Sequence, residues 1–158
     1  MRPIHTILTA LMLLISTGLM AQSRTLAMLQ RCIDSTAMAG NALRPEINAA
    51  KLCAESFADA MEKALTHKEM EPLLRSLEQG RVSEASDWVT DQDSMPIFQR
   101  YAMMARLSVL GLQLADADEY YHNSLRYDEG ATFGHLLEYA RYCQTTGLIH
   151  KAQDLTQR

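Results

Sequence analysis

The side chains that most often perform chemistry are sparse and poorly spaced in this sequence. Its five histidines are His5, His67, His122, His135 and His150. No two of them stand four residues apart, the spacing that places two metal ligands on one helix face. The sequence also lacks a glycine-rich phosphate loop, a Gly-x-Ser-x-Gly turn and a Cys-x2-Cys pair. We therefore expect no metal site, no cofactor and no enzymatic activity.

A small group of acids, Asp116, Asp118 and Glu119, stands at the start of a predicted helix. Carboxylates in that position complement the positive end of the helix dipole, which accounts for them without catalysis. For Asp118 and Glu119 to work as an acid/base pair they would need a cleft, and no feature of the sequence indicates one.

Cysteine spacing predicts a covalent bond between Cys32 and Cys53. Both are equidistant from a turn predicted at residues 40–45, so they lie at the same height in an antiparallel helical hairpin. A disulfide needs Cα atoms about 4.4–6.8 Å apart, which only closely packed helices provide. The alternative, that both stay reduced in the core as expected for Cys143, remains open.

Composition indicates which elements position these residues. The chain has 158 residues, 47% of them apolar and 22% charged, as in a single soluble globular domain. Seven glycines and four prolines are too few for a turn-dense β-fold, so we expect an all-α protein. A net charge of −4 gives no electrostatic basis for binding nucleic acid.

The first residues match a secretory signal peptide. Arg2 precedes an apolar run over residues 7–15, and a small residue, Ala21, stands at the expected cut. We therefore assign residues 1–21 as signal peptide and expect an exported, periplasmic or otherwise extracytoplasmic protein. An uncleaved membrane anchor is the alternative. Because export leads to an oxidising compartment, it would permit the disulfide.

The remaining chain divides into a helical hairpin, residues 22–67, and helical repeats, residues 68–158. Two repeat units are offset by 35 residues, and in each a pair of alanines stands twelve residues apart. Small residues there allow two antiparallel helices to approach closely, while larger residues fill the space around the contact. The positions expected to pack in this way are Tyr101, Met104, Ala105, Ala117, Tyr121, Leu136, Tyr139, Ala140 and Ala152.

This pattern resembles the tetratricopeptide repeat family, in degenerate form and of an exported bacterial type. Residues 98–131 fit its spacing well, and residues 133–158 fit on their first helix. The resemblance implies a right-handed α-solenoid of antiparallel helix pairs, with the last unit truncated. It also implies a concave groove, lined by the first helix of each unit, that holds a ligand.

Within that groove, Arg106 and Arg141 occupy equivalent places 35 residues apart. Successive arginines could grip a carboxylate or an acidic segment bidentately, with Gln99 and Gln144 as neighbours.

Two functions follow from this interpretation. The first is an exported scaffold that binds a protein or peptide in the groove. The alternative is the extracytoplasmic input region of a longer membrane-bound signalling protein, of the histidine kinase or transcription regulator type. In that case the membrane would be reached only through a part of the protein beyond residue 158. The sequence does not identify the partner.

Overall fold

The computed structural model describes residues 24–40, 43–64, 67–127 and 133–157, and the predicted signal peptide lies outside them. Within these ranges every regular element is a helix, which confirms the all-α prediction. None of the described helices is both long and apolar enough to cross a bilayer. The first helix covers residues 24–39. It is followed by α2 (Arg44–Ala64), α3 (His67–Glu78), α4 (Val82–Thr90), α5 (Ile97–Leu110), α6 (Leu114–Tyr127), α7 (Phe133–Thr145) and α8 (Ile149–Thr156).

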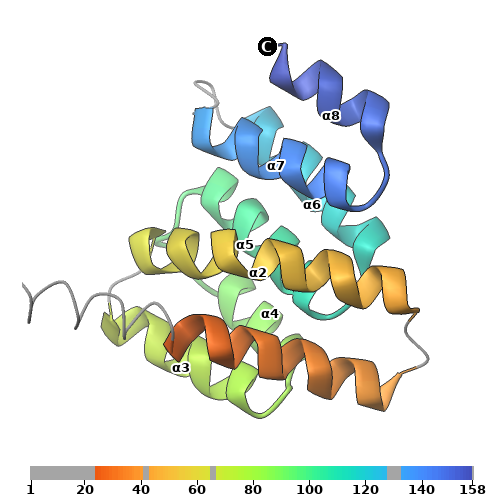
Figure 1. Cartoon of the computed structure of the whole chain (residues 1–158). Coiled ribbons are helices and arrows are strands. Elements are labelled where there is room, and N and C mark those ends of the chain that lie inside the picture. The colour runs from red at the N-terminus through yellow and green to blue at the C-terminus, as the bar shows by residue number, and fades with distance from the viewer. Residues whose placement is uncertain (1–23, 41–42, 65–66, 128–132, 158) are drawn as a thin grey trace, which may run out of the picture.

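The first helix and α2 form an antiparallel hairpin (Figure 1). Leu29 and Ile33 are fully buried on the first helix, and Phe57 and Met61 on α2, at the helical spacing that places each pair on one face. Burying these side chains stabilises the hairpin by about 1.5–3 kcal/mol for each side chain. An ion pair of 2.6 Å between Lys51 and Asp34 links the exposed sides of the two helices.

Three further hairpins, α3–α4, α5–α6 and α7–α8, follow along the chain and share one turn geometry. The turn residues Gly80, Leu112 and Gly147 all have positive φ angles, of 68°, 59° and 82°. In each turn the next residue donates its N–H to the carbonyl five positions earlier, which is the Schellman end of a helix. These bonds are Arg81 to Ser76 at 2.9 Å, Gln113 to Ser108 at 2.8 Å and Leu148 to Cys143 at 2.8 Å.

A small residue follows each turn at the same place. Ala85, Ala117 and Ala152 each stand five residues after the residue with positive φ. Ala85 and Ala117 are fully buried and Ala152 is half-buried, so the second helix of each hairpin lies close to its neighbours. The hairpins therefore repeat as local structures, and Figure 1 shows them following one another toward the C-terminus.

Helix α2 packs against the first helix of every hairpin, namely α3, α5 and α7 (Figure 1). Helix α5 is the most enclosed element, with eight of its residues buried, because α2, α4 and α6 all contact it. One continuous core thus runs from the N-terminal hairpin to Leu155 of α8. The face that the resemblance assigns to a ligand is covered by a helix of the same chain.

Candidate functional site

Arg106, predicted to line the groove, lies in the protein interior. Only 5% of its side chain is exposed. Its Nε and Nη2 atoms donate hydrogen bonds of 2.9 Å each to Oε1 and Oε2 of Glu138 on α7. Tyr121 on α6 donates its hydroxyl to the same carboxylate at 2.8 Å. The prediction that Arg106 faces a ligand is therefore wrong. Because neighbouring helices enclose α5, the Arg106 guanidinium binds Glu138 inside the protein.

The electrostatics of this cluster are those of a structural ion pair. Burial by itself lowers the pKa of Arg106, but the charge and hydrogen bonds of Glu138 outweigh it, and the pKa is raised overall. Burial and the adjacent Glu138 carboxylate raise the pKa of Tyr121 well above its usual value. Arg106 and Tyr121 therefore both hold their protons at neutral pH, and neither is poised to transfer one.

Asp118, considered above as half of an acid/base pair, is also satisfied within the fold. Its carboxylate accepts a hydrogen bond of 2.8 Å from the Tyr139 hydroxyl and one of 2.7 Å from Lys151 on α8. The Lys151 ammonium also lies 5.7 Å from the centre of the Tyr139 ring. Asp118 therefore ties α6 to α7 and α8, and the structure does not pair it with Glu119.

The other three predicted groove residues do not gather at one place. Arg141 and Gln144 are exposed on α7, three residues apart and hence on one face of that helix. Gln99 lies half-buried at the start of α5, next to Trp88 in a separate cavity. Because Arg106 is internal and Arg141 is exposed, the two arginines are not equivalent, and the predicted two-arginine clamp is not formed.

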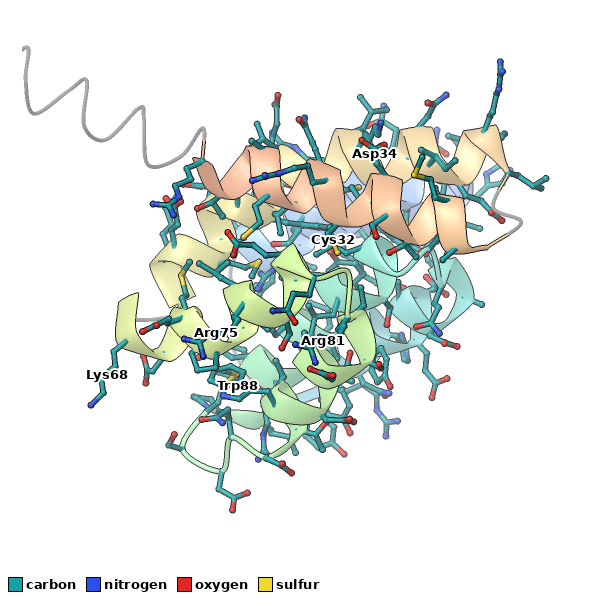
Figure 2. The ribbon with its side chains drawn as sticks, turned by 90° about the horizontal axis from the view of Figure 1, so that it is seen from below. Cys32, Asp34, Lys68, Arg75, Arg81 and Trp88 are labelled. Atoms are coloured by element: carbon teal, nitrogen blue, oxygen red, sulfur yellow. The ribbon has the colours of Figure 1, made fainter. Side chains whose placement is uncertain are left out.

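The cavity beside Gln99 has a volume of about 120 Å³. A pocket for a drug-sized molecule measures about 300–1,000 Å³, so this cavity has room for little more than one side chain. Figure 2 shows the face of the molecule that carries Trp88, the single tryptophan of the sequence. The cavity is lined by Glu69, Trp88, Gln92, Ser94, Met95, Pro96 and Gln99.

The structure contradicts the predicted disulfide. Cys32, Cys53 and Cys143 are all free and buried. Cys53 lies with its Sγ atom 3.5 Å from the Thr145 hydroxyl oxygen, because this side of α2 packs on α7. Burial raises the pKa of Cys32 to about 11 and that of Cys143 to about 12, so both remain protonated at neutral pH.

The tyrosines separate into two groups that sequence spacing did not distinguish. Tyr121, Tyr139 and Tyr142 are buried and stack on one another between α6 and α7, with ring centroids 5.1–6.3 Å apart. Tyr142 also donates its hydroxyl to the Leu114 carbonyl. Each of these three hydroxyls has a partner inside the protein, so this group is part of the core.

Tyr101, Tyr120 and Tyr127 form the second group, which we call the tyrosine row. Tyr101 on α5 and Tyr120 on α6 are half-buried, while Tyr127 at the end of α6 is 48% exposed. The Tyr101 ring lies 5.4 Å from that of Tyr127 and 6.3 Å from that of Tyr120. None of the three hydroxyls hydrogen-bonds to another residue in the part of the chain that the structure describes. The row thus presents contiguous aromatic surface and three free phenol groups.

The sequence analysis missed the tyrosine row, because it assigned Tyr101 to repeat packing and gave Tyr120 and Tyr127 no role. It also missed Glu138 and Lys151 as buried or half-buried ion-pair partners. One signal was present in the sequence: Arg106 stands inside the apolar stretch of residues 102–110. A charged side chain in so apolar a helix is buried, and a buried charge needs a partner of opposite charge. Glu138 likewise stands among apolar residues in the sequence, between Leu137 and Tyr139.

Among the described residues, no group of three or more histidine, cysteine, aspartate or glutamate side chains lies close enough together to hold a metal ion. Comparison with known proteins gave no match to any family model, to any curated protein or to any solved structure.

Proposed function

We propose that this chain is a helical scaffold that binds a protein or peptide partner, and that the tyrosine row is its contact surface. The row is the observation that carries the proposal. Tyrosine is enriched at protein interfaces because it offers a large, rigid apolar area and a polar tip at low cost in conformational entropy. Here three such side chains stand together, and their hydroxyls bond to no residue within the described ranges.

The repeated hairpins support a solenoid of the tetratricopeptide type as the scaffold. The turns at Gly80, Leu112 and Gly147 have one geometry, at intervals of 32 and 35 residues. A repeat of this length is typical of that architecture. Since α2 covers the first helices of the hairpins, the proposed contact surface lies on α5 and α6, away from the groove that the resemblance implies.

Export belongs to this proposal, and its support is the N-terminal pattern of a charged start, a short apolar run and a small residue. An exported scaffold would meet its partner outside the cytoplasm. Fusing residues 1–21 and the full chain separately to a reporter that is active only after export tests this part by itself.

The binding proposal is tested by panning a random peptide display library on the full chain. Selected peptides are then titrated against Tyr101→Ala and Tyr120→Ala. We expect both substitutions to weaken binding at least about tenfold, as for aromatic residues at an interface centre.

The matched control is Leu52→Ala. Leu52 is 70% exposed on α2, so this variant also removes an exposed apolar side chain, but from another helix. Its affinity should equal that of the wild type. Selected peptides that bind the tyrosine variants as tightly as the wild type would contradict the proposed surface. Circular dichroism of each variant shows that the helices are retained.

A further inference from the structure

We propose that the partner segment is a proline-rich peptide in the polyproline II conformation, with a basic residue at one end, lying along the tyrosine row. This inference rests on the function proposed above and assigns the chemistry of the partner. The order of the rings, their spacing, their hydroxyls and the charge at each end of the row all favour such a peptide.

The three rings form a continuous series with Tyr101 in the middle. Helices α5 and α6 are antiparallel, and a hydrogen bond of 2.9 Å from the Ser124 hydroxyl to the Phe98 carbonyl fixes their register. Tyr120 and Tyr127 are seven residues apart on α6, and the Tyr101 ring of α5 contacts both of their rings, so it stands between them. The Tyr101 ring is inclined by 8° to that of Tyr127 and by 33° to that of Tyr120. Because the Tyr101 and Tyr127 rings are stacked, their facing sides cover each other, and the pyrrolidine rings of proline meet the ring edges along the row and the outer ring faces at its two ends.

The spacing of the row matches the repeat of a polyproline II helix. Tyr120 and Tyr127 lie about 10.5 Å apart along α6, given a rise of about 1.5 Å per residue. In polyproline II, prolines three residues apart are about 9.3 Å apart, because each residue rises about 3.1 Å. Two prolines of a Pro-x-x-Pro segment can therefore rest against the two ends of the row, with the segment between them passing over Tyr101.

The free hydroxyls suit a peptide that has no internal hydrogen bonds. The backbone carbonyls of polyproline II point outward and accept hydrogen bonds from the surface that binds them. Tyr101, Tyr120 and Tyr127 each have a phenol O–H donor that no described residue accepts. Asn123 lies between the two α6 tyrosines on the same helix face and is half-buried, so its side-chain amide adds a donor there.

Charge at the ends of the row gives the peptide a direction. Asp116 is exposed one helical turn before Tyr120, and Arg126 is exposed beside Tyr127. Neither forms an ion pair with another described residue. A basic residue of the peptide is therefore attracted to the Asp116 end and repelled from the Arg126 end.

The experiment is calorimetric titration of the full chain with three synthetic peptides of equal length. The first is nonaproline preceded by one arginine; the second replaces the arginine by glutamate; the third replaces the prolines by alternating glycine and serine. We expect the first to bind, the second to bind more weakly, and the third not to bind. Binding of the third peptide as tight as the first would overturn the inference, as would failure of the first to bind.

Variants locate the site. Tyr101→Ala should lower the affinity for the arginine–nonaproline peptide by about tenfold or more. Tyr120→Phe and Tyr127→Phe keep the rings and remove one hydroxyl donor each. Each should therefore lower the affinity for the same peptide about two- to tenfold. Asp116→Asn should remove the preference for arginine over glutamate. Leu52→Ala should leave every affinity unchanged. Equal affinity of all the tyrosine variants for nonaproline would overturn the assignment.

The two proposals fail separately. If library peptides without proline bind the row and are lost in Tyr101→Ala while nonaproline does not bind, the contact surface stands and the partner chemistry is wrong. If no selected peptide depends on the row, the proposed function itself is wrong.

Discussion

Arg106 shows how the surroundings of one residue decide its role. A guanidinium in the interior is tolerated only with its donors satisfied, and Glu138 satisfies two of them bidentately while accepting a third hydrogen bond from Tyr121. The cluster joins α5, α6 and α7, so its loss affects three helices at once. Removing one charge should therefore be far more damaging than removing both.

We predict that Glu138→Gln lowers the free energy of unfolding by about 3–5 kcal/mol, because it leaves the Arg106 charge buried without a counter-ion. Glutamine keeps an oxygen that can accept the Tyr121 hydrogen bond. The double variant Arg106→Met/Glu138→Gln removes both charges and should regain more than half of that loss. Urea unfolding at pH 7, followed by circular dichroism, measures both values. A double variant less stable than the single one would contradict a buried ion pair.

At the scale of elements, three helical hairpins close with the same turn, but different residues occupy it. Gly80 and Gly147 adopt positive φ without strain, whereas Leu112 adopts it with a side chain that packs on the core. The two glycines also differ in their surroundings. A Cβ at Gly80 would come within 2.7 Å of the Ser35 hydroxyl oxygen, while a Cβ at Gly147 would meet nothing within 4 Å. The turn at Gly80 therefore packs directly against the first helix.

We predict that Gly147→Ala lowers the free energy of unfolding by about 1 kcal/mol, through the positive φ angle alone. Gly80→Ala should cost more, by on the order of 1 kcal/mol, because it adds the steric contact with Ser35. In a Ser35→Ala background this excess should largely disappear. Thermal and urea unfolding of the four variants measure the difference. Equal losses for the two glycines would show that the Gly80 turn and the first helix are not in close contact.

At the scale of the whole molecule, the position of α2 determines how the hairpins are joined in one core. This helix contacts α3, α5 and α7, so the N-terminal hairpin and the repeated hairpins share one core. A chain of independent hairpins would lose stability locally, each hairpin contacting only its neighbours. A shared core should instead make unfolding cooperative across the molecule.

We predict that Phe57→Ala, on α2, lowers the free energy of unfolding by about 3–5 kcal/mol, because Phe57 is fully buried. The loss should appear equally in the hydrogen exchange of α2 and in that of the slowest-exchanging amides of α7. Unchanged protection of α7 in this variant would mean that the N-terminal hairpin unfolds by itself, as a division at residues 22–67 and 68–158 allows.

The sequence by itself determined the features that depend on neighbouring residues. The scarcity of glycine and proline predicted an all-α chain, because the helical preference of a segment is set by residues a few positions apart along the backbone. The spacing of Ala105 and Ala117 likewise followed from the need for close helix approach, and both side chains are fully buried.

Tertiary structure decided what depends on segments far apart in the chain. Arg106 and Arg141 have the same repeat position, but among the described residues only Arg106 forms an ion pair, with Glu138 of the next hairpin. Tyr120 and Tyr121 are adjacent in sequence, but one faces Tyr101 at the surface and the other Glu138 in the core. Cys53 contacts Thr145, ninety-two residues away, instead of bonding to Cys32. Periodicity places a residue on a helix face, and the packing of distant helices decides what covers that face.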